Sequence, residues 1–213
     1  MTIRMRKRPE EAGQSMLEVA LILPFLALLL VATVEAGFAL RDYLMVQSAN
    51  REGVRWAVRT PPGDEYRDHF HSAAEVESVF NRIRIAADEG GLREDDVSII
   101  FTHVYIADED EDGQREPTIF KATWPPGFDY PPGFDDGDIL TLSVDNATKA
   151  ASINATRQSA GYEPLWNEVV VIEVFYRHET VWGFDIVGSF GRDWTMYAQS
   201  SMRMVGTGRL GGE

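Results

Sequence analysis

A run of acidic residues is the part of this sequence that comes nearest to a metal-binding motif. Asp108, Asp110 and Asp112 alternate with two glutamates and are followed by Gly113. This order matches the D-x-D-x-D-G opening of a calcium loop, in which alternating carboxylates converge on one hard cation. The twelfth position is Ile119, where an EF-hand has a bidentate glutamate. Two interpretations stay open, a calcium site at these three aspartates and a solvated acidic hairpin tip, and the second is favoured.

No other group of side chains in the sequence indicates catalysis or a cofactor. We find no nucleophile elbow, no phosphate-binding loop and no H-E-x-x-H motif. The chain has no cysteine, which excludes disulfides, thiolate zinc sites and a thiol nucleophile. His69 and His71 could place two imidazoles on one side of a strand, but no third ligand accompanies them. We therefore expect a protein that is not an enzyme and has no cofactor apart from the calcium considered above.

The charge of the chain excludes nucleic acid as a partner. The net charge is -14, while residues 1–13 hold four basic and two acidic side chains, so residues 14–213 carry -16. Binding to phosphates needs the opposite sign. The short basic segment at the start is instead typical of the cytoplasmic side of a membrane anchor.

One apolar segment is long enough to position the chain in a membrane. From Val19 to Leu40 the residues are apolar or small with few exceptions, and about 20 such residues cross a hydrocarbon core. Glu18 and Glu35 would then lie near the two interfaces. A cleaved secretory signal is the alternative, but this run exceeds the usual h-region of ~7–15 residues. We expect a membrane-spanning helix with the N-terminus in the cytoplasm.

The helix is predicted to continue well beyond the membrane. No proline interrupts the chain between Leu40 and the Thr60–Gly63 break, where Pro61 and Pro62 end the helical pattern. Arg51, Arg55 and Arg59 follow one another at spacings of four and form a basic stripe on one face. A solvated face is the ordinary explanation of such a stripe. Contact with the acidic domain of a neighbouring subunit is the alternative.

The N-terminal residues resemble a known family. The sequence from Gly13 to Pro24 reads GQSMLEVALILP, and it is followed by VEAG at Val34–Gly37 and ANREGVRWA at Ala49–Ala57. This combination resembles the TadE-like family, the minor pseudopilins of the tight-adherence (Flp) type IV pilus system. The resemblance implies that a prepilin peptidase cuts after Gly13 and leaves Gln14 as the mature terminus. It also implies that Glu18 pairs with the amino terminus of an adjacent subunit.

The same resemblance implies a function and a location. The chain would be a minor pseudopilin that takes part in assembling or initiating an Flp pilus, with pilin and pseudopilin subunits and the pilus assembly platform as partners. It would cross the inner membrane once, hold its C-terminal domain outside the cytoplasm and enter a surface pilus. Val19 stands where subunits of this system often carry an aromatic residue. An uncleaved, membrane-tethered binding module that enters no filament is therefore kept as the alternative.

The remaining sequence predicts an α+β domain with an antiparallel sheet packed on helix. We divide the chain into a basic leader (1–13), a transmembrane and extended helix (14–59) and an extracytoplasmic domain (60–213). Ser72 and Glu75 form a capping box that opens a helix, and Gly90 stops it. Segments rich in β-branched and aromatic residues predict strands at Val97–Ile106, Ile139–Val144, Val169–Tyr176 and Trp194–Val205. A near repeat, PPGFDYPPGFD at Pro125–Asp135, is interpreted as an extended surface loop.

Overall fold

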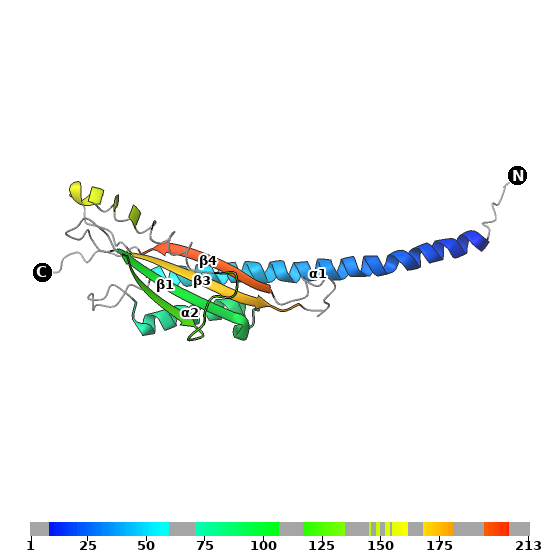
Figure 1. Ribbon diagram of the computed structural model, residues 1–213, viewed down its shortest axis with the longest axis horizontal. Coiled ribbons are helices and arrows are strands. Elements are labelled where there is room, and N and C mark those ends of the chain that lie inside the picture. The colour runs from blue at the N-terminus through cyan, green and yellow to red at the C-terminus, as the bar shows by residue number, and fades with distance from the viewer. Residues whose placement is uncertain are drawn as a thin grey trace. The chain divides into compact units, whose positions relative to one another are not determined.

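The helices α1 (Pro9–Arg59) and α2 (Ala73–Glu89) and one four-stranded sheet make up most of the described part of the computed structural model. The structure describes residues 9–59, 71–106, 117–134, 145, 148–149, 152–153, 155–161, 168–180 and 194–204. Its elements in chain order are the helices α1 and α2, the short 3-10 helix η1 (Glu94–Asp96), and the strands β1 (Val97–Ile106), β2 (Pro117–Trp124), β3 (Glu168–His178) and β4 (Trp194–Arg203). The predicted class, a long apolar helix followed by an antiparallel sheet packed on helix, is confirmed (Figure 1).

The chain divides into two compact units, and the division falls within α1. The helix up to Arg41 belongs to one unit. From Asp42 onward the helix belongs to the other unit, together with α2, η1 and all four strands. We call this second unit the globular unit. The last part of α1, from Asp42 onward, is therefore one of its core helices.

Helix α2 is built as the sequence predicts. Ser72 Oγ accepts a hydrogen bond from the Glu75 amide at 3.3 Å, and the Ser72 amide donates to Glu75 Oε2 at 2.6 Å. This capping box satisfies two amides that the first turn of a helix leaves without partners. Gly91 adopts a φ of 79° just after the helix, a left-handed conformation that favours glycine. The buried stripe of α2 is Val76, Val79, Phe80, Ile83 and Ala87.

The sheet is antiparallel throughout, in the order β2-β1-β3-β4. Strand β1 matches its predicted bounds, and β3 and β4 cover their predicted segments within two residues at each end. The edge strand β2 was not predicted, and the predicted strand at Ile139–Val144 lies outside the described residues. In the centre, Phe101 of β1 lies opposite Ile172 of β3 and both are fully buried.

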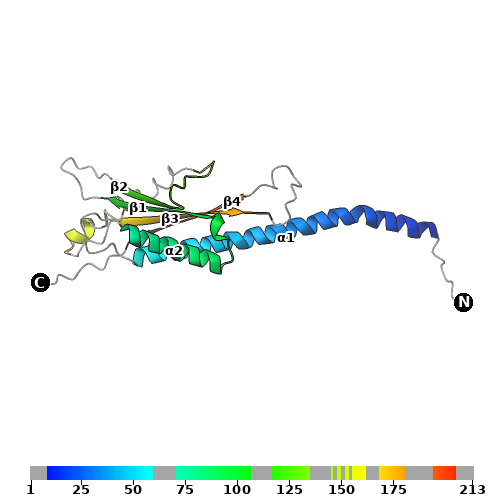
Figure 2. The ribbon, with the colours of Figure 1, turned by 90° about the horizontal axis from the view of Figure 1, so that it is seen from below.

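The last part of α1 and the whole of α2 cover the same face of the sheet. Figure 2 shows the cyan end of α1 and the whole of α2 beneath the strands. A methyl group built on Gly53 of α1 would lie 2.3 Å from Ile83 of α2 and 3.6 Å from Ile172 of β3. The three elements therefore meet around Gly53.

The segment after β2 packs its aromatic side chains on the opposite face. Each PPGF unit makes a turn in which the phenylalanine amide donates to the first proline carbonyl at 3.0 Å, and Gly127 and Gly133 adopt φ of 80° and 92°. These are the conformations of type II turns. Phe128 and Phe134 thereby reach Phe175 of β3, at ring distances of 5.6 and 5.4 Å. The repeat is thus a surface loop, as predicted, whose rings form an aromatic cluster on the sheet.

A buried carboxylate lies within this aromatic cluster. Glu173 of β3 is fully buried and accepts hydrogen bonds from Tyr130 at 2.7 Å and from Tyr197 at 3.2 Å. Burial of the Tyr197 hydroxyl and the nearby Glu173 charge raise the pKa of Tyr197 above its ordinary value. The tyrosine therefore keeps its proton and its role as a donor to Glu173. This pairing satisfies a charge that would otherwise destabilise the core.

A second carboxylate attaches η1 to β3. Burial of the Asp96 side chain raises its pKa, but hydrogen bonds from Arg93 and Arg177 outweigh this effect and leave the pKa below its ordinary value. Arg177 donates from Nε at 3.0 Å and from Nη2 at 2.7 Å to one oxygen of Asp96, and Arg93 donates from Nε at 2.6 Å to the other. Asp96 is thus ionised and paired at neutral pH.

Candidate functional site

The predicted processing and assembly residues lie in the first turns of α1. The helix begins at Pro9, so Gly13 and Gln14 have helical backbone. Proline at the first helical position is favoured, since its missing N–H would have no partner there. Glu18 lies one turn beyond Gln14, and the Gln14 Nε2 amide donates to Glu18 Oε1 at 3.4 Å. Residue 14 and the Glu18 carboxylate therefore share one face of the helix.

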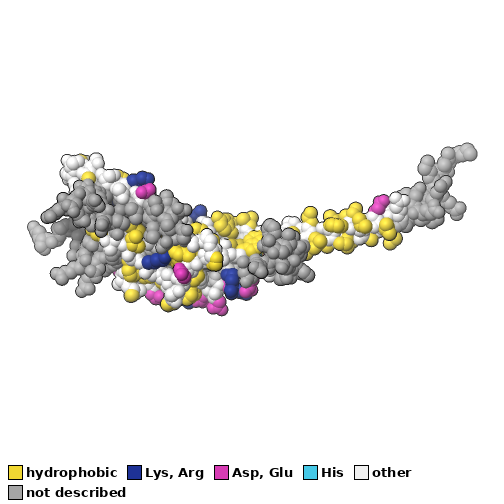
Figure 3. All heavy atoms as spheres, viewed as in Figure 1, with side chains coloured by type: hydrophobic (Ala, Val, Ile, Leu, Met, Phe, Trp, Pro, Cys, Tyr) yellow, Lys and Arg dark blue, Asp and Glu magenta, His cyan; other side chains and the backbone are white. Residues whose placement is uncertain are grey.

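The part of α1 after Glu18 exposes its apolar side chains on all sides. Leu21 is 66% exposed, Phe25 69% and Leu29 66%, and Figure 3 shows apolar side chains along the visible face of this part of the helix. A continuous apolar surface of this length marks contact with a membrane or with other proteins. Within the described residues, α1 is the single helix long and apolar enough to cross a membrane. The N-terminal apolar helix indicates a membrane-anchored protein.

The span contains one hydroxyl side chain and one proline, and both are compatible with lipid. Thr33 Oγ1 donates to the Leu29 carbonyl at 2.7 Å, so the hydroxyl is satisfied inside the helix. Pro24 lies inside α1 and removes the hydrogen bond to the carbonyl of Ala20, four residues earlier. Such a proline is tolerated in membrane helices, where neighbouring helices and local adjustments satisfy the freed carbonyl.

Beyond Asp42, α1 buries one face in the globular unit. The buried positions follow a helical period of three and four residues, and they are Val46, Ala49, Asn50, Gly53, Val54 and Ala57. Asn50 is fully buried among them, and its Nδ2 donates to the carbonyls of Ile172 at 3.1 Å and Ala198 at 2.5 Å. One side chain thus fixes α1 to the backbones of β3 and β4.

Two further contacts hold α1 at either end of this segment. Near its start, Asp42 Oδ2 lies 2.8 Å from Nδ1 of His178, a buried residue of β3. Near its end, the Ala57 carbonyl lies 3.1 Å from His71 Nε2. A carbonyl oxygen can only accept, so His71 Nε2 carries the proton and donates. The contacts prevent α1 from sliding or rotating on the sheet.

His71 belongs to a row of three buried polar side chains, with His103 and Glu168. Its Nδ1 lies 3.2 Å from Nδ1 of His103, and His103 Nε2 lies 3.7 Å from Glu168 Oε2. With the proton of His71 on Nε2, its Nδ1 accepts, so His103 Nδ1 donates. Both nitrogens of His71 are therefore occupied within the protein. No group of three side chains that could hold a metal ion occurs among the described residues.

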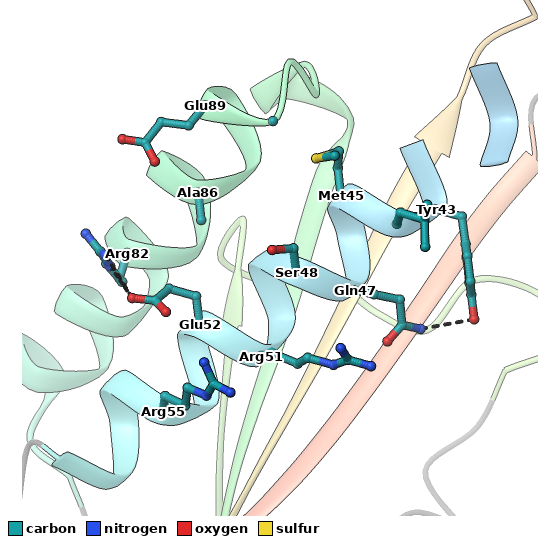
Figure 4. A pocket seen from close by; sticks show the side chains of 12 residues that line it. Tyr43, Met45, Gln47, Ser48, Arg51, Glu52, Arg55, Arg82, Ala86 and Glu89 are labelled. Atoms are coloured by element: carbon teal, nitrogen blue, oxygen red, sulfur yellow. Dashed lines mark hydrogen bonds and ion pairs between the residues drawn. The ribbon is translucent and has the colours of Figure 1, made fainter. Parts of the chain in front are cut away.

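A groove runs between α1 and α2 on the surface of the globular unit. We call it the α1–α2 groove. It has a volume of about 760 Å³ and is lined by Tyr43, Leu44, Met45, Gln47, Ser48, Arg51, Glu52, Arg55, Arg82, Ala86, Glu89 and Gly90. Figure 4 shows arginines from both helices along it, with Arg82 turned toward Glu52. Arg82 Nη2 donates to Glu52 Oε1 at 2.8 Å, so these two charges are paired.

Sequence reasoning missed several of these residues. It did not single out Asn50, the pairing of Asp42 with His178, or the groove. An asparagine in phase with apolar residues along a helix is the signal that could have pointed to Asn50. The calcium prediction for Asp108, Asp110 and Asp112 falls outside the described residues, and it stays a prediction.

The model of the family of TadE-like proteins matches residues 13–55. No curated protein matches the chain. No solved structure matches it either. The matched stretch begins at Gly13, covers the apolar span and ends two residues after Gly53. It therefore includes both the exposed part of α1 and most of the part that is buried on the sheet. Residues 13–55 of this chain are therefore similar to TadE-like proteins, which confirms the resemblance seen in the sequence.

Proposed function

We propose that this chain is a minor pseudopilin of a tight-adherence pilus, inserted by α1 and assembled by helix-to-helix packing. The similarity of residues 13–55 to TadE-like proteins suggests a membrane protein associated with this pilus system. The observation that carries the finer proposal is the combination of Gly13, Gln14 and Glu18 at the head of an exposed apolar helix. The role is structural rather than catalytic, and the peptidase and assembly platform are separate proteins.

The position of Glu18 supports an assembly contact. A charged side chain inside a membrane is unfavourable by roughly 2.5–3.5 kcal/mol at the helix centre, and such residues usually have a partner. Processing after Gly13 would create an ammonium group at Gln14 on a neighbouring subunit. Pairing of that ammonium with the Glu18 carboxylate would satisfy both charges when two subunits pack together.

The exposed apolar side chains supply the packing surface. In lipid, helices associate by close van der Waals packing and by polar contacts rather than by the hydrophobic effect. Leu21, Phe25 and Leu28 lie at spacings of four and three on one face and are 66%, 69% and 46% exposed. These positions would touch a neighbouring helix in a filament or at its base.

Site-specific photo-crosslinking tests this proposal. A benzophenone amino acid replaces Leu21, Phe25 or Leu28 in turn, and native membranes are irradiated. We expect at least one position to yield an adduct with a pilin-type subunit, identified by mass spectrometry. The same probe at the exposed Ile153 of the globular unit is the control for collision. Adducts with lipid alone at all three positions would favour the tethered module instead.

A further inference from the structure

The arginines of the α1–α2 groove differ in how they are paired. Arg82 is paired with Glu52, and its guanidinium also lies 5.7 Å from the Trp56 ring. Arg51 and Arg55 are exposed, and neither has an ion pair within the part of the chain that the structure describes. They lie four residues apart, so their side chains neighbour each other on α1. Figure 4 shows both beside the groove.

The groove therefore has a basic rim on a protein that is otherwise acidic. Three arginines line it against Glu52 and Glu89, while residues 14–213 carry a net charge of -16. Met45, Leu44 and Ala86 add apolar surface between the charges. A surface that joins an apolar wall to two available guanidinium groups suits a peptide segment with carboxylates. Guanidinium groups bind carboxylates through paired, charge-assisted hydrogen bonds.

Lipid headgroups are a poorer fit to these arginines. Along α1, Arg51 lies eleven residues beyond Leu40, the last residue of the apolar run, and Arg55 lies fifteen beyond it. At 1.5 Å per residue these are about 16 Å and 22 Å of helix. The attraction of an anionic membrane surface falls off within a Debye length of ~8–10 Å. Both arginines are therefore separated along α1 from the end of the apolar run by more than this length, which favours a peptide over a lipid headgroup as their partner.

The chain itself carries the complementary segment. Residues Asp108 to Asp112 are five consecutive carboxylates with no basic residue among them. Five adjacent negative charges repel one another unless a counter-charge is near. Two copies of an acidic protein repel each other at long range. Salt screens this repulsion, while oppositely charged groups in close contact still attract each other. A local match between this run and the groove can therefore hold two copies together.

We propose that the α1–α2 groove receives the acidic run Asp108–Asp112 of a second copy of this chain. Arg51 and Arg55 pair with its carboxylates, while the apolar side of the groove contacts the flanking residues. The contact does not depend on processing after Gly13 or on entry into a filament. It can therefore fail or succeed independently of the proposed function.

The absence of cysteine in the sequence allows a clean crosslinking test with the full-length chain in detergent micelles. Ser48 lines the groove, and Gly113 directly follows the acidic run. The variants Ser48→Cys and Gly113→Cys are purified separately, mixed and oxidised. We expect several-fold more disulfide-linked dimer in the mixture than in either variant alone. Mixing Ser48→Cys with Ser159→Cys, another exposed position, gives the background level.

Charge reversal then tests the arginines. Arg55→Glu in the Ser48→Cys chain should reduce the dimer to background, and Asp110→Arg in the Gly113→Cys chain should restore it. Lys149→Glu, an equal charge change at another exposed residue, should leave the yield unchanged. An unchanged yield of disulfide-linked dimer with Arg55→Glu would overturn the proposal. So would a disulfide that forms inside single chains of a Ser48→Cys/Gly113→Cys double variant at high dilution, because the segment would then occupy its own groove.

Discussion

Glu18→Ala is expected to abolish piliation while the amount of membrane-bound protein stays the same. Removing a carboxylate from the head of the span makes insertion easier, since charge in a membrane helix is unfavourable. The change removes the proposed partner of a neighbouring amino terminus. An ammonium group left unpaired among packed helices destabilises their association, because a buried charge without a partner is costly.

The measurement is complementation of a deletion strain, scoring surface pili beside membrane-bound protein. Glu77→Ala is the matched control, since it removes one exposed carboxylate from α2 of the globular unit and should leave piliation intact. Among the described side chains, Glu18 is hydrogen-bonded to its helix neighbour Gln14 and to no residue of the globular unit, so the fold should not change. Normal piliation with Glu18→Ala would remove Glu18 from the assembly surface and favour the tethered module.

Gly53→Ala is expected to destabilise the globular unit although alanine is the better helix former. In an open helix, alanine is favoured over glycine by about 1 kcal/mol. At Gly53 the new methyl group would lie 2.3 Å from Cγ1 and 2.6 Å from Cδ1 of the fully buried Ile83. Overpacking of a well-packed core costs about 1–3 kcal/mol. The clash should therefore outweigh the gain in helix propensity and lower the melting temperature.

A second glycine of α1 provides the matched control. A methyl group at Gly37 meets nothing within 4 Å, so Gly37→Ala should leave the melting temperature of the full-length chain in micelles unchanged or slightly raised. Gly53→Ala should also cost less in an Ile83→Ala background, where the clashing atoms are absent. Equal melting curves for Gly53→Ala and the unmodified chain would mean that α1 does not approach α2 as closely as described.

Local signals in the sequence predicted the elements that depend on them. The capping box at Ser72 and the apolar stripe of α2 rest on contacts within one helix, and both are present. Central strands β1 and β3 are fully buried for most of their length, so they read as apolar runs. The exposed span of α1 is recognisable from length and composition alone.

What the sequence could not predict depends on partners far along the chain. Strand β2 begins with a proline and carries Lys121 at its middle, because an edge strand has one neighbour and needs fewer apolar residues. Asn50 appears as an ordinary polar helix residue until the backbones of β3 and β4 are placed beside it, more than 120 residues away. The groove arises only where α2 packs beside the last part of α1.

The intact mass of the native protein shows whether the leader before Gln14 is removed. Membranes from cells with an active prepilin peptidase are solubilised, and the purified chain is weighed by mass spectrometry. If the protein is a processed pseudopilin, its mass corresponds to a chain that begins at Gln14 and keeps its amino group, since a cyclised glutamine would have no ammonium to pair with Glu18. A Gly13→Leu variant should keep the leader and serve as the uncut reference. A native mass that still includes the residues before Gln14 would mean that the chain is not a processed pseudopilin.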